Sequence, residues 1–206
     1  MAPTVPSSAA PPADPRIARS EAAIRKAVLV RLKAGRSFET LTVSEIASAA
    51  GVTRKTFYAR FGTLERVVFR IVAELSQRIV DELEDEVLRL PRGADSAAAR
   101  VFQAYAVHQD VLGPVVAHCP AGLVLDAVTH VADRLLDRVV AVNGLPQLDD
   151  ARRDYLVTVV ASMVHGVLLV WVRRGFTEAP EALAALTDAL LAEGIERILL
   201  AGSAVE

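Results

Sequence analysis

The helix boundaries encoded in residues 42–64 constrain the fold of this chain more than any other feature. Two glycines and three threonines alternate there at positions that suit helix ends and helix starts: Thr42, Gly51, Thr53, Gly62 and Thr63. Thr is a good N-cap, and Gly is common just past a helix end. Glu45, at the third helical position after Thr42, completes the pattern of a capping box. We therefore expect short helices over residues 43–50 and 54–61, joined by a tight turn as a helix-turn-helix.

The second short helix has two faces of different character. Phe57 and Phe61 are four residues apart, so they lie on one side of a helix and predict its buried face. The opposite side carries Lys55, Thr56 and Ala59, with Arg54 and Tyr58 flanking it. Arg and Lys can donate to guanine edges, Thr and Tyr hydroxyls suit phosphates, and a small Ala lets a helix approach a groove closely. This outward face predicts contact with duplex DNA.

The rest of the chain also predicts helices, and no stretch alternates convincingly as a strand does. A first helix is expected over residues 16–34, and a long helix begins at Leu64 with an apolar stripe that extends to Val87. Further helices are expected near residues 95–109, 111–117, 121–143, 148–174 and 179–201, with breaks at Gly113-Pro114, at Pro120, at 144–146 and at 175–180. The sequence thus predicts an all-α fold. An N-terminal three-helix helix-turn-helix domain is joined by a long helix to an all-helical regulatory and dimerisation domain.

Charge divides the chain into a basic part and an acidic part. Residues 16–70 contain twelve Lys and Arg against four Asp and Glu, a net charge of +8, whereas residues 71–206 contain eleven against twenty, a net charge of −9. This asymmetry indicates that the N-terminal part meets a polyanion. The sign changes inside the long helix, so we expect the domains over residues 16–70 and 71–206 to be rigidly joined. Residues 1–15, with five prolines and no Lys or Arg, are expected to form a disordered tail.

The spacing of residues across the helix-turn-helix resembles that of the TetR (tetracycline-repressor) family. The matching residues are Phe38, Leu41, Thr42, Val43, Ile46, Ala47, Ala50, Gly51, Val52, Thr53, Thr56, Phe57, Tyr58 and Phe61. Near the C-terminus, Gly166, Trp171 and Gly175 look like the penultimate helix of many members, which forms a dimer interface with the last helix. The resemblance implies a homodimeric DNA-binding regulator. A single cysteine, Cys119, and the lack of a signal-peptide pattern fit a cytoplasmic protein.

The resemblance also implies a set of DNA-contacting residues on the two short helices. They are Thr42, Ser44, Arg54, Lys55, Thr56, Tyr58 and Arg60. Lys55 stands where the family often has glycine, which strengthens the expectation of a base or phosphate contact. Leu64 stands where the family often has a Lys that contacts a phosphate. The N-terminus of that helix with Thr63, helped by Arg60 or Arg66, would then receive the phosphate.

Residues 155–172 form an eighteen-residue segment without a formal charge, which is the lower limit for a membrane-spanning helix. Arg pairs flank it at both ends and set no orientation, so we expect a helix buried in protein. One domain core can cover only part of such a helix, and a symmetric partner is expected to cover the rest. The expected dimer interface comprises Val159, Gly166, Val170, Leu190 and Ile198.

Two groups of residues are candidates for a ligand pocket in the C-terminal domain. Val101, Tyr105 and His108 share one helix face, while Thr158, Ser162 and His165 form a polar stripe on an otherwise apolar helix. Two interpretations stay open. The polar groups could satisfy one another in the core or across a dimer interface, or they could orient a ligand in a mostly apolar pocket. In the second case the segment around Gly113-Pro114 is expected to be a short, poorly anchored piece that moves.

Other kinds of site have little support in the sequence. The four histidines and the single cysteine match no strong metal-ligand spacing, so no metal or cofactor is expected. No nucleophile with a base and an orienting acid is present, and no phosphate-cradling glycine loop, so no enzyme is expected. The favoured function is a repressor released from a near-palindromic operator by a small, mostly apolar effector. The alternative is a DNA-binding regulator that has no small-molecule ligand and is controlled by a protein partner.

Overall fold

The computed structural model describes residues 15–90 and 96–201, with side chains described through Leu190. The helices are α1 (Pro15–Lys33), η1 (Phe38–Thr40), α2 (Val43–Ala49), α3 (Arg54–Arg60), α4 (Leu64–Asp81), η2 (Asp85–Leu88), α5 (Ala97–Val107), α6 (Gln109–His118), α7 (Ala121–Val142), α8 (Asp150–Arg173) and α9 (Pro180–Ala201). Over these ranges there is no strand, which confirms the predicted all-α fold. The predicted tail before Pro15 and the side chain of Ile198 lie outside the described residues.

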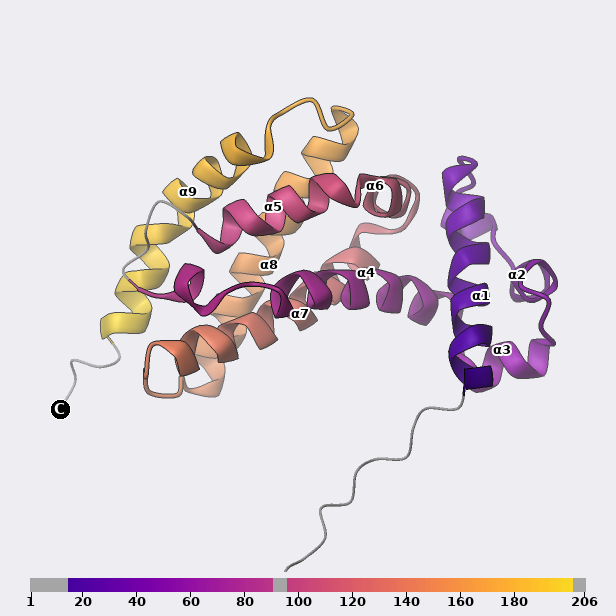
Figure 1. Ribbon diagram of the computed structural model, residues 1–206, viewed down its shortest axis with the longest axis horizontal. Coiled ribbons are helices and arrows are strands. Elements are labelled where there is room, and N and C mark those ends of the chain that lie inside the picture. The colour runs from indigo at the N-terminus through magenta and orange to yellow at the C-terminus, as the bar shows by residue number, and fades with distance from the viewer. Residues whose placement is uncertain (1–14, 91–95, 202–206) are drawn as a thin grey trace, which may run out of the picture.

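A small domain and a larger one lie at opposite ends of α4 (Figure 1). Helices α1, α2 and α3 form the small domain, and α5 to α9 gather around the other end of α4. Within the larger part, α4 packs on α7, α7 on α8, and α5 on α9, while α6 contacts both α1 and α8. One cluster of buried side chains runs from Ile24 on α1 through Val68 on α4 to Trp171 on α8. This continuous core favours a rigid connection between the two parts.

The helix boundaries of the small domain follow the predicted caps. The side-chain oxygens of Thr42, Thr53 and Thr63 each accept a hydrogen bond from the backbone N–H three residues later, at 3.2, 3.1 and 3.3 Å. Gly51 and Gly62 adopt positive φ angles of 66° and 74°, which side chains with a Cβ rarely adopt. The turn between α2 and α3 and the break before α4 are therefore set by residues within the turns themselves.

Glu45 departs from the predicted capping box. Its backbone N–H bonds to Thr42, but its carboxylate accepts hydrogen bonds from Arg31 at 2.7 Å and from Arg36 at 3.3 Å. The bond from Arg31 is the main reason why the pKa of Glu45 lies below its usual value. Glu45 therefore ties α2 to α1 and to the segment after α1 instead of closing its own cap.

Helix α4 is shorter than its apolar stripe predicts. The stripe continues in the sequence to Val87, but the helix ends at Asp81 and the short 3-10 helix η2 follows. The guanidinium of Arg138 on α7 donates to the backbone carbonyls of Val80 and Leu83. These bonds satisfy carbonyl groups that a helix end leaves open, and so they stabilise the turn after α4. Leu83 and Val87 remain buried although they are no longer helical neighbours of the stripe.

The Gly113-Pro114 pair does not break a helix, and the prediction of a break there is wrong. Both residues lie inside α6, which buries Leu112 and Val115 against its neighbours. The ring of Phe176, in the loop between α8 and α9, lies 3.3 Å from the position that a Cβ on Gly113 would occupy. The glycine therefore permits close packing, and Pro114 costs the helix one backbone hydrogen bond. Helix α6 is accordingly well anchored, not the loose piece that the sequence suggested.

Among the described helices, α8 is the one long and apolar enough to span a membrane, judged by length and composition. Its most apolar eighteen-residue window has a mean hydropathy of 2.1, and 33% of that window is buried inside the chain. The buried side of α8 packs against α6, α7 and α9. The remaining side leaves an apolar face that a single chain does not cover.

Candidate DNA-binding surface and regulatory sites

Helix α3 has the two faces that the sequence predicts. Phe57 is fully buried and Phe61 is nearly so, with their ring centres 6.3 Å apart. On the opposite side Lys55 is exposed; Arg54, at the start of the helix, is also exposed, and Tyr58 keeps 51% of its surface exposed. The buried phenylalanines fix the orientation of α3, so its polar side is turned to solvent.

Five of the seven predicted DNA-contacting residues are exposed, namely Thr42, Ser44, Arg54, Lys55 and Tyr58. Thr56 and Arg60 are half-buried. The hydroxyl of Thr56 shares a hydrogen bond of 2.9 Å with the hydroxyl of Thr53 at the start of α3. The Nε atom of Arg60 is buried and has no hydrogen-bond partner within residues 15–90 and 96–201. The outer nitrogens of its guanidinium are thus the part of Arg60 that could reach a phosphate.

Ion pairs occupy many of the basic residues near the DNA-binding helices but not those on α3. The paired residues are Arg25, Arg31, Lys33, Arg36 and Arg70. Within the described part of the chain, neither Arg54 nor Lys55 has an ion-pair partner. A cation of this kind can neutralise a phosphate or reach a base edge without first breaking a contact inside the protein.

The start of α4 has a different character from the rest of the surface. Leu64 has only 9% of its surface exposed, so it packs into the core and cannot contact a phosphate. Thr63 caps the helix by accepting a hydrogen bond from the backbone N–H of Arg66, whose side chain is exposed. Any phosphate contact at this helix end would therefore come from the backbone N–H groups and Arg66.

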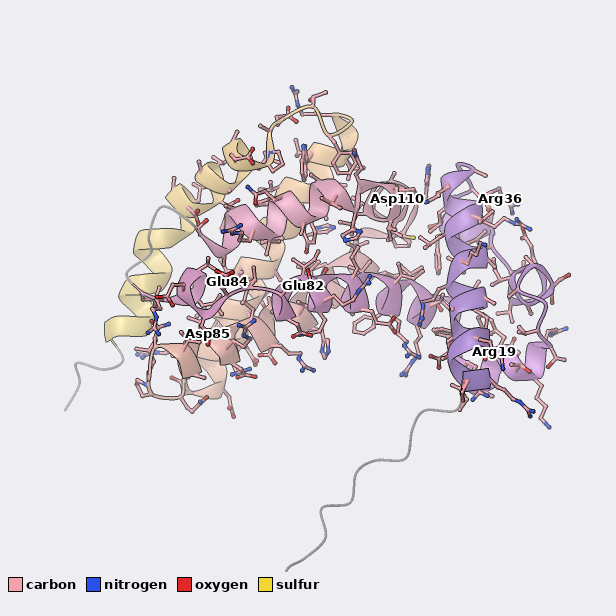
Figure 2. All side chains as sticks on the ribbon, in the orientation of Figure 1. Arg19, Arg36, Glu82, Glu84, Asp85 and Asp110 are labelled. Carbon is pink, nitrogen blue, oxygen red and sulfur yellow. The ribbon has the colours of Figure 1, made fainter. Side chains whose placement is uncertain are left out.

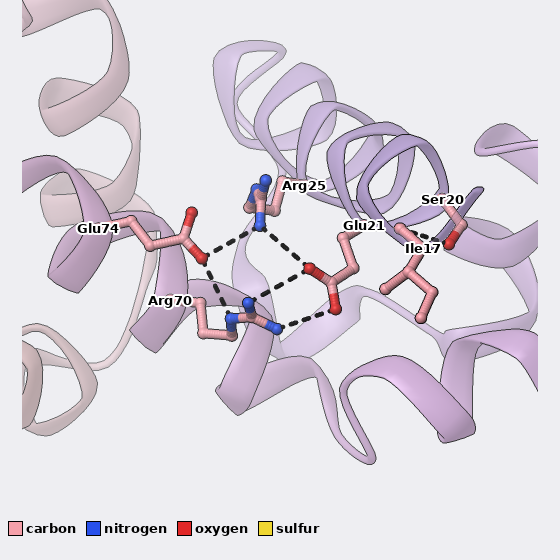
Figure 3. Close-up of polar contacts among 6 residues, drawn as sticks. All are labelled: Ile17, Ser20, Glu21, Arg25, Arg70 and Glu74. Atoms are coloured by element: carbon pink, nitrogen blue, oxygen red, sulfur yellow. Dashed lines mark hydrogen bonds and ion pairs between the residues drawn. The ribbon is translucent and has the colours of Figure 1, made fainter. Parts of the chain in front are cut away.

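Four charged residues fasten α1 to α4 (Figure 3). Arg70 on α4 binds both carboxylate oxygens of Glu21 on α1, each at 3.2 Å, and binds Glu74 at 3.1 Å. Arg25 on α1 binds the same oxygen of Glu74 at 3.2 Å and lies 4.0 Å from Glu21. The Arg70 guanidinium also lies 5.2 Å from the ring centre of Phe61, which follows α3. This network, with Glu21, Arg25, Arg70 and Glu74 as its members, links α4 to both α1 and the end of α3.

Charge differs between the two ends of the molecule. Figure 2 shows Arg19 and Arg36 on the small domain, and Glu82, Glu84 and Asp85 beyond the far end of α4. A polyanion such as DNA is therefore attracted to the end that carries α3 and repelled from the other.

A mostly apolar cavity of about 160 Å³ lies in the larger part of the chain, against α4, α5, α7, α8 and α9. Of the predicted ligand-binding residues, Val101 and Tyr105 line it. Tyr105 is buried, and its hydroxyl lies 3.2 Å from that of Ser76 on α4. Burial raises the pKa of Tyr105, so its hydroxyl stays protonated near neutral pH. Sequence reasoning missed Ser76, although a polar residue between Leu75 and Ile79 in the stripe of α4 was a usable signal.

The other four predicted pocket residues do not line this cavity. His108 follows the end of α5 and lies in a separate groove with Arg78. Thr158 and Ser162 are exposed on the outer side of α8. His165 is buried, and burial lowers its pKa, but it lies outside the cavity lining. The side of α8 that faces the cavity is aliphatic, so of the two interpretations of the polar stripe the structure favours core or interface groups over this pocket.

Cys119 is half-buried, and burial raises the pKa of its thiol to about 12. The reactive thiolate is therefore scarce at neutral pH, which disfavours a redox role. Within the residues that the structure describes, no three His, Cys, Asp or Glu side chains are grouped so that they could hold a metal ion.

Exposed apolar side chains gather on α8 and α9. They are Tyr155, Val159 and Val170 on α8, and Leu186 and Leu190 on α9, with exposed fractions between 51% and 77%. Gly166 lies on the same side of α8 as Val159 and Val170, and a Cβ placed on it would meet nothing within 4 Å. The predicted interface residues Val159, Val170 and Leu190 are thus exposed. Tyr155 on α8 and Leu186 on α9 are two further exposed apolar residues on these helices.

Comparison with solved structures shows that this fold is shared. NalD from Pseudomonas aeruginosa, the secondary repressor of the MexAB-OprM multidrug efflux pump, has a TM-score of 0.55 at 14% identity, covering 88% of this chain and 98% of its own. DhaS, a dihydroxyacetone kinase operon activator, has a TM-score of 0.53 at 16% identity, covering 87% and 97%. A tetR-family transcriptional regulator from Streptomyces coelicolor has a TM-score of 0.50 at 21% identity, covering 90% of each chain.

Sequence comparison identifies the small domain. No curated protein matches the sequence. The family model described as "Bacterial regulatory proteins, tetR family" matches residues 27–71, which include the helix-turn-helix of α2 and α3 and the start of α4. The matched residues include the caps, the glycine turn and the exposed face of α3 described above. This match identifies residues 27–71 as a helix-turn-helix domain of the tetR family, and the chain as a whole shares its fold with the solved structures described above.

Proposed function

We propose that this protein acts as a dimeric repressor that reads a near-palindromic operator with α3 of each protomer. The observation that supports this most is the outward face of α3, where Lys55 stands exposed opposite the buried Phe57 and Arg54 is exposed beside it at the start of the helix. The second helix of such a motif lies in the major groove, and a dimer places its two copies about 34 Å apart, one helical turn of DNA. Lys55 would read a base edge, and Tyr58 would contact a phosphate.

The apolar face of α8 and α9 supports the proposed dimer. Val159, Val170 and Leu190 are apolar side chains that a single protomer leaves exposed. Keeping several such side chains in contact with water costs free energy. A two-fold axis would bring the same face of a second protomer against them, and Gly166 would allow the α8 backbones to approach closely. Thr158 and Ser162, exposed on α8, would then be interface groups and not pocket groups. A dimer of this kind would act in the cytoplasm on a duplex DNA operator.

The apolar cavity supports release of the repressor by a small effector. Helix α4 lines the cavity with Ser76 and Val80 and continues into the network formed by Glu21, Arg25, Arg70 and Glu74. An effector that fits one position of α4 better than another would change the separation of the two α3 helices. Couplings of this kind typically amount to ~1–3 kcal/mol.

The experiment compares two valine-to-glutamate substitutions at exposed positions. Val170→Glu places a charge within the α8–α9 face, whereas Val107→Glu makes the same change on α5, where Val107 is 76% exposed and lies outside that face. Light scattering gives the oligomeric state, and fluorescence anisotropy gives the affinity for an operator selected from random duplex DNA. We expect Val170→Glu to be monomeric and to lose operator affinity by about a hundred-fold or more, because the second half-site no longer binds intramolecularly.

The control protein with Val107→Glu should remain dimeric and bind the operator as the unmodified protein does. A dimer that survives Val170→Glu would refute the proposed interface. A monomer that still binds the operator with full affinity would refute the proposal that two copies of α3 act together.

A further inference from the structure

The cavity between α4, α5, α7, α8 and α9 has an unusually uniform chemistry. Its lining is aliphatic apart from Phe102 and four polar residues, Ser76, Tyr105, Thr187 and Asp188. Thr187 is already satisfied, because its hydroxyl donates to the carbonyl of Leu183 at 2.8 Å. An ionised ligand group placed among aliphatic side chains would lose its hydration without compensation. The lining therefore disfavours charged ligands in general.

Asp188 adds to the selection against negatively charged ligands. It is half-buried on α9, it contributes to the cavity lining, and it is engaged in an interaction inside the protein. Its carboxylate would repel a ligand carboxylate or phosphate brought into the same low-dielectric space. Among charged ligands, an anion is thus disfavoured twice, by desolvation and by repulsion.

The hydroxyls of Ser76 and Tyr105 give the cavity one directional feature. Together they carry two hydroxyl hydrogens, and the bond between them, 3.2 Å long, uses one. Over residues 15–90 and 96–201 no other acceptor is bonded to either hydroxyl, so one donor of this buried pair has no protein partner. Buried donors are costly to leave unpaired, and an oxygen acceptor inside the cavity would satisfy this one.

The size of the cavity limits the ligand as strongly as its chemistry does. Its volume is about 160 Å³. An engineered apolar cavity of about 150 Å³ in another protein holds one benzene molecule. The space therefore suits one ring or a short branched chain, with a few further atoms.

We propose that this cavity selects small uncharged molecules, about the size of one substituted ring, that carry a single oxygen acceptor such as a ketone carbonyl. The carbonyl oxygen accepts the free hydrogen of the Ser76–Tyr105 pair, and the apolar body fills the aliphatic part of the cavity. Only the description of this ligand as an effector rests on the proposed function, because the binding itself depends on the cavity alone.

Four probes of nearly equal size separate the contributions of the carbonyl oxygen and of ligand charge to the binding affinity. Acetophenone has the ring and the carbonyl, and α-methylstyrene replaces the carbonyl oxygen with a CH₂ group. Benzoate carries a negative charge, and 1-phenylethylamine carries a positive one. Calorimetry with the full chain at pH 7 should show acetophenone binding about two- to twelve-fold more tightly than α-methylstyrene, which is the range expected for one net hydrogen bond. Benzoate should bind at least about a hundred-fold more weakly than acetophenone.

The double substitution Ser76→Ala with Tyr105→Phe removes both hydroxyls and leaves the shape of the cavity nearly unchanged. It should abolish the preference for acetophenone, with a ratio of one or below, because the ketone oxygen would then be buried without a partner, while α-methylstyrene still binds. Circular dichroism and operator binding check that the variant is folded. A ketone preference that persists in this variant overturns the assigned role of the hydroxyl pair. Tightest binding of benzoate or of the amine overturns the selection for uncharged ligands, and no binding by any probe to folded protein overturns the ligand site.

Operator binding in the presence of acetophenone separates this inference from the proposed function. If acetophenone binds but the operator affinity does not change, the ligand class stands and the proposed release mechanism fails. If the protein binds no operator at all while acetophenone still binds, the proposed function fails and the ligand site stands.

Discussion

Replacing Glu21 with glutamine should weaken the attachment of α1 to α4 while keeping the size of the side chain. Glu21 accepts two hydrogen bonds of 3.2 Å from Arg70 and lies 4.0 Å from Arg25, and its side chain is only 16% exposed. Glutamine can replace one of the two bonds to Arg70 but carries no charge. Because Arg70 keeps Glu74 as a partner, the substitution does not leave an uncompensated buried charge.

The expected loss lies between two limits. Fully exposed ion pairs contribute roughly 0.2–1 kcal/mol, whereas a hydrogen bond to a charged group in a shielded site contributes about 1.5–3 kcal/mol. Glu21 is mostly shielded, but its partner Arg70 is 36% exposed. We therefore expect Glu21→Gln to lower the free energy of unfolding by about 1–2 kcal/mol. Urea denaturation followed by circular dichroism measures it, since urea, unlike guanidinium, does not screen the charges.

Glu65→Gln is the matched control. Glu65 lies in the first turn of α4, is exposed and has no ion-pair partner within the described residues. Its substitution should change the free energy of unfolding by less than about 0.5 kcal/mol. Equal effects of the two substitutions would refute the claim that the Glu21 network holds α1 on α4.

The remaining predictions concern the recognition helix, the packing of α6 and the single cysteine. Lys55→Ala should weaken operator binding by ~1–3 kcal/mol and relax specificity at one base position, measured by anisotropy with single-base variants of the operator; unchanged specificity would mean that Lys55 contacts no base. Gly113→Val should lower the free energy of unfolding by about 1–3 kcal/mol, because the new side chain meets the ring of Phe176, whereas Gly122→Val, which meets nothing within 4 Å, should cost less in the same urea titration. Because burial raises its pKa to about 12, Cys119 should react with iodoacetamide at pH 8 at least about ten-fold more slowly in the native protein than in urea, and equal rates would show that the thiol is not shielded.

Features that depend on nearby residues were predictable from the sequence. Thr53 caps α3 through a backbone N–H only three residues away, and Gly51 supplies a backbone conformation that no distant residue needs to impose. The inward position of Phe57 follows from helical periodicity alone. For this reason the helix-turn-helix, its outward face and the family resemblance could all be identified before the fold was known.

Features that depend on distant residues were not predictable in the same way. Helix α4 ends where Arg138, more than fifty positions away, binds the carbonyl of Val80 in its last turn and that of Leu83 just beyond it. Gly113 was predicted to break a helix because a Gly-Pro pair usually marks a turn. Its close packing against Phe176 could not be predicted, since only the tertiary fold brings the two residues together. The face of α8 that carries Thr158 could not be distinguished from the buried face, since both sides of this helix are apolar and periodicity gives no direction.

The central claim, that α3 reads a specific operator, is tested most directly by a ratio of two affinities of the full chain. The first is its affinity for a selected operator, and the second is its affinity for a scrambled duplex of equal length and composition. Both affinities are measured at one fixed salt concentration near 150 mM, because nonspecific binding depends strongly on salt. We predict a ratio of about a thousand or more, and a selected sequence with two-fold symmetry. A ratio close to one would contradict the account, because the exposed face of α3 would then provide only a positive charge for the phosphate backbone.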